Sequence, residues 1–234
     1  MKRISVIIPT YQHAQTLGYC LHSLFAQTRK PDEVIVVDDG STDETKNVLS
    51  EFGEKVRYFF QENKGAPSAR NAGARHATGN YLLFCDADVI TDPSMLQKME
   101  RILEIHPEVT YVYCGMRFGH KRFQSRPFDP SELRRQNYIH TTSLIRANAF
   151  PQFDESLKRF QDWDLWLTLL EKGKIGIELQ EELFTVRTVP GRNGISQWMP
   201  SFFYRIPWSL LGWKPASVRT YDQAREVIRL KHHL

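Results

Sequence analysis

The chain has 234 residues, of which 41% are hydrophobic and 25% are charged. This length suits one sizeable α/β domain with a small appended lobe, and the composition excludes wholesale disorder. The formal net charge of +4 is compatible with an anionic ligand or membrane surface, but it is too small, and the cations are too scattered, to indicate nucleic-acid binding.

Three cysteines, Cys20, Cys85 and Cys114, lie in apolar stretches without the spacing of metal ligands. An odd number of such cysteines predicts buried free thiols in a reducing compartment. The apolar run after Met1 is too short for a signal peptide, and no stretch approaches the roughly 20 apolar residues of a membrane-spanning helix. We therefore expect a cytoplasmic protein.

The first 115 residues alternate between strand-like and helix-like segments. Five runs rich in β-branched and aromatic residues predict strands buried on both faces, at Ile4–Ile8, Glu33–Val37, Val56–Phe60, Tyr81–Cys85 and Val109–Tyr113. The helices predicted between them carry an apolar stripe from Leu17 to Phe25, follow a Ser41/Glu44 capping box, run from Pro67 to Gly79, and follow Asp92-Pro93. This order predicts a mostly parallel sheet with helices on both faces and ligands at the carboxyl ends of the strands.

Beyond Gly115 the pattern loosens, and residues 116–137 predict an irregular surface segment. The elements expected after it are a strand at Thr142–Arg146, a helix at Asp162–Lys172 ending at Gly173, a strand at Leu183–Arg187, a loop at 188–196, the aromatic segment Trp198–Trp213 and a helix at Ser217–His232.

Two carboxylates, Asp86 and Asp88, flank Ala87 directly after a buried run. Carboxylates at such a strand end can bind one hard cation, and that cation can neutralise a departing diphosphate. An Asp-x-Asp triplet alone is a weak pattern, and the alternative is a loop that caps the helix after Asp92. Its position after the strand favours the metal site.

A second acidic pair, Asp38 and Asp39, ends the second predicted strand. A carboxylate there can accept a hydrogen bond from a nucleotide base or ribose, or it can simply form a turn. We expect Asp39 to be the ligand and Asp43 to start the next helix. The string 62–73 joins a cationic loop to a helix N-terminus, which suits a phosphate or the ribose-phosphate edge.

Together these strings resemble the inverting family-two glycosyltransferases of the GT-A fold. The strings that carry the resemblance are Ser5–Tyr11 (SVIIPTY), Asp38–Asp43 (DDGSTD), Asn63–Gly65 (NKG) with Ala69–Gly73 (ARNAG), and Asp86–Asp88 (DAD). They occur in the family's order, and the resemblance covers residues 3–115 closely. It implies an α/β fold of GT-A type, with a mostly parallel central sheet, helices on both faces and a small acceptor-side region.

The resemblance also implies an activity, in which a sugar moves from a nucleoside-diphosphate sugar, expected to be a UDP-sugar, to an acceptor hydroxyl. The cofactor would be a divalent metal, Mn²⁺ or Mg²⁺. The pathway would be synthesis of cell-surface polysaccharide, lipopolysaccharide or another glycan. A noncatalytic nucleotide-sugar-binding protein or partner subunit of the same fold is the main alternative.

By the same resemblance, individual residues of the first half acquire roles. The implied donor contacts are Pro9, Thr10 and Tyr11 at the base, Asp39 at the uracil or its equivalent, Lys64 and Arg70 near the ribose and base, and Asp86 with Ala87 near the ribose or metal. Asp88 would coordinate the metal that bridges the diphosphate.

The second half resembles the family more thinly. In Phe160–Trp166 (FQDWDLW), Asp162 would be the general base and Asp164 the second choice, although Gln161 stands where the family usually has glutamate. Helix capping is the alternative role for Asp162. Other candidate diphosphate or acceptor contacts are His140, Arg187 and Arg192, the last in a loop that resembles the family's flexible donor-covering segment; each also has a structural or solvent-exposed alternative.

We expect a GT-A domain at 1–197, with a nucleotide-sugar-binding half (1–115) and an acceptor-binding half (116–197), and an aromatic-rich tail at 198–234. The tail's rings suit peripheral contact with the inner face of a membrane and a lipid-linked acceptor, or packing on the domain or a partner. The partners expected are therefore a nucleotide-sugar donor and a glycan or lipid-linked acceptor, without nucleic acid.

Two other classes fit the sequence less well. A phospho-acceptor receiver domain could bind Mg²⁺ at Asp38-Asp39, but it would be about half this length and would not use Asp86 and Asp88. A dinucleotide enzyme would need a glycine-rich turn after the first strand, where this chain has Pro9-Thr10-Tyr11-Gln12.

Overall fold

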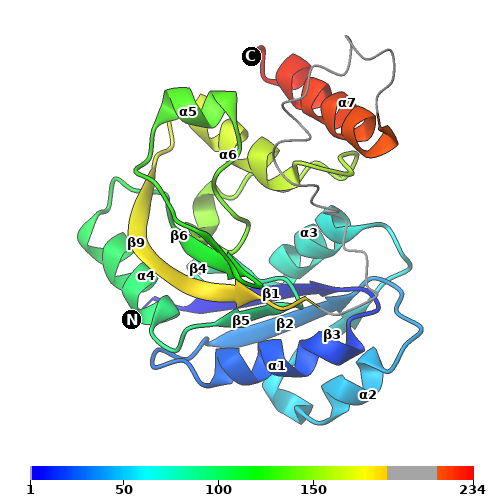
Figure 1. Ribbon diagram of the computed structural model, residues 1–234. Coiled ribbons are helices and arrows are strands. Elements are labelled where there is room, and N and C mark those ends of the chain that lie inside the picture. Colours follow the sequence, from blue (N-terminus) through cyan, green and yellow to red (C-terminus); the bar gives the residue numbers. More distant parts are fainter. Residues whose placement is uncertain (1, 189–214) are drawn as a thin grey trace.

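A computed structural model describes residues 2–188 and 215–234 of the chain (Figure 1). Within these ranges nine strands form one sheet in the order β3-β2-β1-β4-β8-β6-β9-β5, with β7 paired to β6. The strands are β1 (Ile4–Thr10), β2 (Glu33–Asp38), β3 (Arg57–Phe60), β4 (Tyr81–Phe84), β5 (Val89–Thr91), β6 (Tyr111–Phe118), β7 (Lys121–Phe123), β8 (Leu144–Arg146) and β9 (Gly176–Val186). The α-helices are α1 (Ala14–Phe25), α2 (Thr45–Ser50), α3 (Ala66–His76), α4 (Met95–Ile105), α5 (Pro130–Arg135), α6 (Gln161–Glu171) and α7 (Ala216–Lys231).

The sheet is parallel where the sequence alternates strand and helix, as predicted. β3, β2, β1 and β4 run parallel to one another. β8 is antiparallel to both β4 and β6, and β6 then pairs in parallel with the long strand β9. β9 curves from β6 towards β5, which it meets in antiparallel register (Figure 1).

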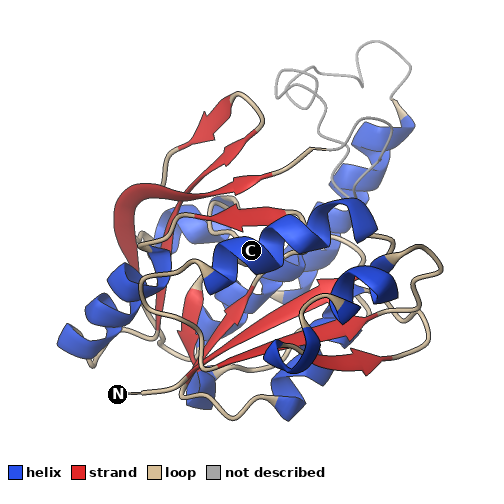
Figure 2. Ribbon diagram, turned by 90° about the horizontal axis from the view of Figure 1, so that it is seen from below, coloured by secondary structure: helices blue, strands red, loops and turns tan. Residues whose placement is uncertain are grey.

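Helices cover both faces of the sheet (Figure 2), because alternate residues of each central strand point to opposite sides. In β1, Ile4, Val6 and Ile8 join one buried cluster with residues of α1 and α4. Ile7 faces the other side and joins a cluster that includes Trp163 and Trp166 of α6. This two-sided burial explains why the sequence of these strands is continuously apolar.

Helix α3 lies unusually close to β1. A Cβ at Gly73 would overlap the side chain of Ile7, so only glycine permits this approach. Gly65, the N-cap of α3, has φ 94°, a conformation that L side chains rarely adopt. These two glycines explain part of the string 62–73 in terms of the backbone alone.

Several boundaries differ from those predicted. Residues 116–137 are not an irregular segment, since they contain the end of β6, the β6–β7 hairpin and α5. The strand predicted at Leu183–Arg187 is the end of the 11-residue β9. The third helix ends at His76, before Gly79, which packs against Ser5.

The Ser41/Glu44 capping box is also wrong. Helix α2 begins at Thr45, and its N-cap, Glu44, makes no side-chain cap hydrogen bond. Asp43 starts the helix instead, as expected, because its Oδ1 accepts from the backbone N–H and the hydroxyl of Thr45. The Ser41 hydroxyl accepts from the N–H of Gln12, at the end of β1.

Other predictions are confirmed. All three cysteines are buried and free, and the C-terminal helix forms as α7. Among the described residues, none of the helices combines the length and the apolar character needed to cross a bilayer. The aromatic segment 198–213 lies outside the described residues.

Candidate active site

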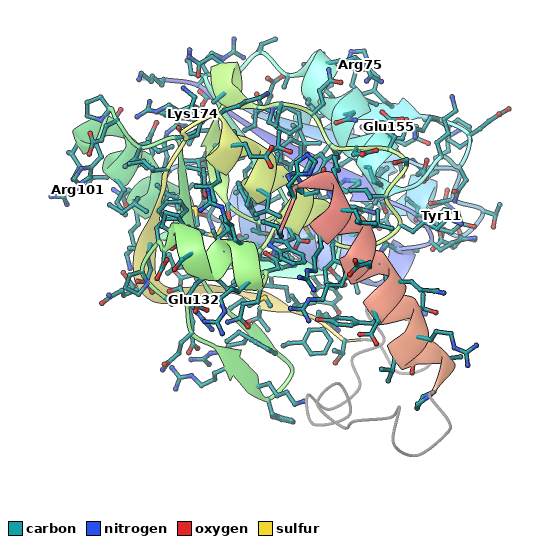
Figure 3. All side chains as sticks on the ribbon, turned by 90° about the horizontal axis from the view of Figure 1, so that it is seen from above. Tyr11, Arg75, Arg101, Glu132, Glu155 and Lys174 are labelled. Atoms are coloured by element: carbon teal, nitrogen blue, oxygen red, sulfur yellow. The ribbon has the colours of Figure 1, made fainter. Side chains whose placement is uncertain are left out.

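The carboxyl ends of β1 and β2 lie side by side. Thr10 is the register partner of Asp38, and the N–H of Asp39 donates to the carbonyl of Thr10 at 2.8 Å. Thr10 is buried, yet its hydroxyl has no hydrogen-bond partner among the described residues. The next side chain, Tyr11, lies at the surface with 44% exposure (Figure 3). An orphaned hydroxyl beside an exposed ring suits a planar ligand with polar edges.

Asp39 organises the loop that precedes α3. Its Oδ1 accepts from the side chain of Gln61 at 2.7 Å and from the N–H of Lys64 at 2.8 Å, and its Oδ2 accepts from the N–H of Gly65 at 2.8 Å. The predicted contact of Asp39 with a base stays a prediction, since both of its oxygens already hold this loop. The side chain of Lys64 is exposed at the loop's rim.

Asp38 has a structural environment of its own. Its Oδ1 accepts from the N–H of Ser41 at 2.9 Å, and its Oδ2 accepts from the hydroxyl of Tyr58 at 3.2 Å. Burial and the charge of Asp38 together raise the pKa of Tyr58 to about 12. Asp38 therefore fixes the turn and the edge strand β3.

Arg70 of α3 reaches from the first half of the chain to the second. It is 6% exposed, its Nη2 pairs with Oδ1 of Asp86 at 2.7 Å, and its Nη1 donates to Oε1 of Gln161 at 2.8 Å. The sequence predicts that Arg70 contacts the nucleotide. In the structure its two terminal nitrogens contact protein side chains, and the contact with a nucleotide stays a prediction.

Asp86, Ala87 and Asp88 form the turn between β4 and β5. Burial opposes the ionisation of Asp86, but the charge of Arg70 and the hydrogen bond from its guanidinium outweigh it, so the pKa of Asp86 lies below its usual value. The carbonyl of Asp88 accepts from the N–H of Arg187, at the end of β9, at 2.8 Å. Both aspartates are half-buried.

The carboxylates of this turn fit a hard divalent cation, but only as part of its coordination shell. Within residues 2–188 and 215–234 no group of three His, Cys, Asp or Glu side chains could hold a metal ion. One oxygen of Asp86, Oδ1, already accepts a hydrogen bond from Arg70. A magnesium-like cation binds through one or two carboxylates together with substrate phosphates and water, so Asp88 with Asp86 supplies what such a site needs from the protein.

His140, between α5 and β8, lies close to both halves of the site. The N–H of Thr142 donates to its Nδ1 at 3.1 Å, so a neutral ring carries its proton on Nε2. Burial lowers the pKa of His140, while the charges of Asp86 and Asp162 act in the opposite direction. The ring of His140 therefore interacts electrostatically with both Asp86 and the candidate base Asp162.

Asp162 lies in the first turn of α6, where the helix dipole favours a negative charge. Its Oδ1 accepts from the N–H of Trp163 at 2.9 Å. The residue before the helix, Phe160, has a left-handed backbone (φ 59°, ψ 28°), which is costly for a phenylalanine and turns the chain into α6.

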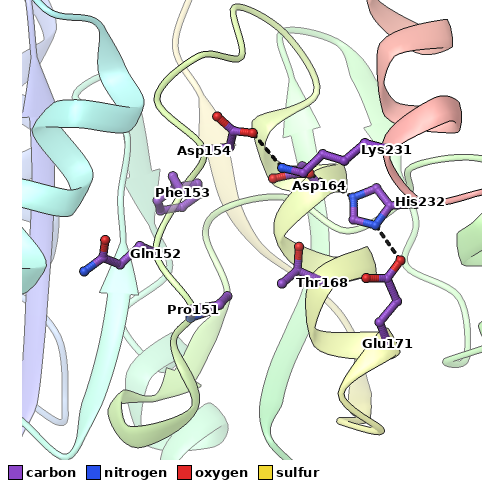
Figure 4. A pocket seen from close by; sticks show the side chains of 9 residues that line it. All are labelled: Pro151, Gln152, Phe153, Asp154, Asp164, Thr168, Glu171, Lys231 and His232. Atoms are coloured by element: carbon purple, nitrogen blue, oxygen red, sulfur yellow. Dashed lines mark hydrogen bonds and ion pairs between the residues drawn. The ribbon is translucent and has the colours of Figure 1, made fainter.

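Asp164, the second choice for the base, lies apart from this group. It is 3% exposed, and its Oδ1 lies 2.8 Å from Nε2 of His232 and 2.7 Å from Nζ of Lys231. These groups, with Asp154 and Glu171, surround an open cavity of about 410 Å³ between α6 and α7 (Figure 4). A buried carboxylate held by the ammonium of Lys231 and a ring nitrogen of His232 is a structural anchor.

Of the two arginines predicted at the diphosphate, Arg187 lies among the described residues and Arg192 does not. The guanidinium of Arg187 lies 3.7 Å from the ring centroid of Tyr19, over its face, beside the turn of Asp88. Arg192 lies outside the described residues.

Three contacts of the site were missed by sequence reasoning. They are the link from Arg70 to Gln161, the clamp of Asn71 on Phe153, and the anchoring of α6 by the last turn of α7. Asn71 stands in the ARNAG string, so a polar residue on a buried helix face was visible there. Nothing in the sequence pairs it with position 153.

Comparison with known proteins agrees with this geometry. The sequence profile described as glycosyl transferase family 2 matches residues 5–159. An uncharacterized glycosyltransferase of Rickettsia typhi is 32% identical over 190 residues, which cover 74% of this chain and 60% of that protein. A Bacillus subtilis protein, EpsE, which is provisionally named a glycosyltransferase, is 30% identical over 202 residues, which cover 79% of this chain and 73% of that protein.

Solved structures have the same fold at lower identity. TarS of S. aureus, in complex with UDP-GlcNAc, superposes with a TM-score of 0.73 at 22% identity, covering 87% of this chain and 64% of that one. A mannosyltransferase of Pyrobaculum calidifontis, in complex with GDP-Man and Mn²⁺, superposes with a TM-score of 0.64 at 22% identity, covering 82% and 58%. The predicted GT-A fold is confirmed, and this chain belongs to glycosyl transferase family 2.

Proposed function

We propose that the protein is an inverting, metal-dependent glycosyltransferase that moves a hexosyl group from a UDP-sugar to a hydroxyl of a glycan or lipid-linked acceptor. Its pathway would be the synthesis of cell-surface polysaccharide, lipopolysaccharide or a related glycan. One observation carries the proposal. Arg70 joins Asp86, on the turn that would hold the metal, to Gln161, whose neighbour Asp162 is the candidate base. Donor and base then belong to one site.

On the donor side, the orphaned hydroxyl of Thr10 would meet the base or ribose, and the exposed ring of Tyr11 would stack on the base, with Pro9 beside them. The loop held by Asp39 would present Lys64 at the rim. Asp88, with Asp86, would hold the cation, which when bound neutralises the diphosphate as it leaves. Arg187 would add positive charge beside the same turn.

On the acceptor side, Asp162 would take the proton of the attacking hydroxyl. The acceptor oxygen forms a bond to the anomeric carbon from the face opposite the diphosphate, and the bond from that carbon to the diphosphate oxygen breaks. The configuration inverts in a single displacement. His140 would donate from Nε2 towards the acceptor or the departing phosphate.

The solved relatives lend support to the donor class and the metal. TarS has been solved with UDP and with UDP-GlcNAc, and the Pyrobaculum enzyme with GDP-Man and Mn²⁺. The chain spans 60% of the length of the Rickettsia typhi relative, so the acceptor and the pathway belong to the proposal alone. Peripheral contact with a membrane through residues 198–213 belongs to it as well.

The test is release of nucleoside diphosphate from a panel of nucleotide sugars, with Mn²⁺ or Mg²⁺ and with or without acceptors. Asp88→Ala should abolish metal-dependent donor binding. Asp162→Asn should bind UDP with Mn²⁺ as the wild type does, while turnover falls by 10²-fold or more, about the contribution of a general base. Wild-type turnover in Asp88→Ala would remove the metal assignment, and full activity in Asp162→Asn would remove the base. Donor binding without turnover on any acceptor would favour the noncatalytic alternative.

A further inference from the structure

We propose that Gln161 is a positioning residue that holds Arg70 against Asp86 and thereby fixes the metal-binding turn relative to the helix of the base. This inference rests on the proposed function, because it assigns Gln161 a part in that reaction. A neutral glutamine at this position is then part of a working site, in which it orients Arg70, and it does not indicate that catalysis has been lost.

The side-chain amide of Gln161 is used at both ends. Its Oε1 accepts from Nη1 of Arg70 at 2.8 Å, and its Nε2 donates to the carbonyl of Leu157 at 3.0 Å. The two partners determine the orientation of the amide, since one can only donate and the other can only accept. A glutamate could receive Arg70, but its second oxygen would face the Leu157 carbonyl without a proton between them.

Arg70 has few alternatives to the position in which Gln161 holds it. The guanidinium is 6% exposed, lies 5.4 Å from the ring centroid of Phe153, and pairs with Asp86 at 2.7 Å. A buried cation is stable only when it is paired and hydrogen-bonded. Because the amide is neutral, it orients Arg70 without competing with Asp86 for the positive charge.

The segment that carries Leu157 is itself tied to α3, one residue from Arg70. The side-chain amide of Asn71 donates to the carbonyl of Phe153 at 2.9 Å, and its oxygen accepts from the N–H of Phe153 at 2.8 Å. The link therefore closes a ring that runs from α3 through the segment 153–157 to Gln161 and back to Arg70. Such a ring fixes α3, the turn of Asp86 and the start of α6 as one unit.

The experiment uses the full chain with Gln161→Leu, which removes both hydrogen bonds and adds no charge. Gln223→Leu, on the exposed side of α7, is the matched control. The first measurement is solvent exchange of the Arg70 guanidinium protons, followed by ¹⁵N NMR in the absence of nucleotide. We expect these protons to exchange faster in Gln161→Leu, which has lost the acceptor of Nη1, and at the wild-type rate in Gln223→Leu. This measurement needs no turnover, so it tests the link even if no donor is found.

The second measurement is turnover of the donor that the panel identifies. Gln161→Leu should lower kcat by ~10-fold or more, since it removes a hydrogen bond to a charged group, with a smaller change in KM. Gln161→Glu keeps the acceptor for Arg70 and should retain more kcat than Gln161→Leu. In an Arg70→Lys background, Gln161→Leu should have little further effect, because Gln161 acts through the guanidinium.

Two results would overturn the inference. One is an unchanged exchange rate of the Arg70 guanidinium protons in Gln161→Leu. The other is a loss of kcat in the double variant that equals the product of the losses in Gln161→Leu and Arg70→Lys. A wild-type protein that neither binds UDP with Mn²⁺ nor turns over any donor would refute the proposed function, and the exchange rate of the Arg70 guanidinium protons would still decide the role of Gln161.

Discussion

Carboxylates at opposite ends of one strand have different roles in this protein. At the carboxyl end of β2, Asp39 holds the loop that leads into α3. At the amino end, Glu33 accepts hydrogen bonds from Ser5 of β1, Thr78 before β4 and Arg57 of β3. Burial opposes the ionisation of Glu33, but these hydrogen bonds outweigh it and lower its pKa to about 2. Glu33 therefore ties β1, β2 and β3 to the segment before β4, at the end of β2 far from the site.

Glu33→Gln should lower the free energy of unfolding by up to about 3 kcal/mol at pH 7, since a folded pKa below the unfolded one stabilises the ionised state. That stability is present above the ordinary glutamate value of 4.5 and is lost as the pH falls towards about 2. Urea unfolding between pH 7 and 3 measures it, and the variant's stability should depend less on pH across the acidic range. Glu54→Gln, an exposed change, should match the wild type. Equal acid sensitivity of Glu33→Gln and wild type would contradict the prediction.

At the scale of elements, periodicity and burial determine most of what could be predicted. The four parallel strands and α1, α3 and α4 follow from continuous apolar runs alternating with helical stripes. The β6–β7 hairpin was missed because Arg117, Lys121 and Arg122 mask the strand pattern, and two of them owe their order to one distant residue, Glu182. In the same way, Asp39, Asp86 and Asp162 could be proposed as site residues from strand ends and motifs, whereas the partners of Arg70 could not be predicted. Gln161 lies 91 positions from Arg70, and such a contact depends on how α6 packs.

The close approach of α3 to β1 gives a test of this packing. Gly73→Ala should destabilise the protein by about 1–3 kcal/mol, because the new Cβ overlaps Ile7 and pushes the helix that carries Arg70 away from the sheet. Gly18→Ala is the matched control, since its Cβ would lie 3.6 Å from Val48, in ordinary contact, and alanine favours a helix. Thermal unfolding should separate the two variants in opposite directions. A Gly73→Ala protein as stable as Gly18→Ala would show that the helix can shift without cost.

At the scale of the whole molecule, α7 backs the helix that carries the proposed base. Near the start of α6, Tyr221 packs edge-on against Phe160, with ring centroids 5.1 Å apart. In the first turn of α6, Lys231 and His232 hold Asp164. The desolvation of Lys231 is outweighed by its hydrogen bonds to Asp154 and Asp164, so its pKa is raised. The last 20 residues thus support the strained backbone of Phe160 from behind.

Asp164→Asn should therefore act on α7 first and on the site second. Removing one charge of a buried ion pair while its partners stay in place lowers the free energy of unfolding by about 3 kcal/mol. Here the loss weakens the packing of α7 on the domain. Hydrogen exchange of the α7 amides should accelerate. Binding of UDP with Mn²⁺ should persist, because the proposed donor contacts lie on the first half of the chain. Turnover should fall, because Phe160 loses Tyr221 behind it and Asp162 is less well placed.

Glu226→Gln, an exposed change on α7, is the control and should alter neither the exchange of the α7 amides, nor the binding of UDP, nor turnover. Slow exchange in α7 of Asp164→Asn would mean that its remaining contacts, such as Lys231 with Asp154 and Tyr221 with Phe160, hold the helix without the charge of Asp164. Lost UDP binding would mean that α7 also supports the donor half.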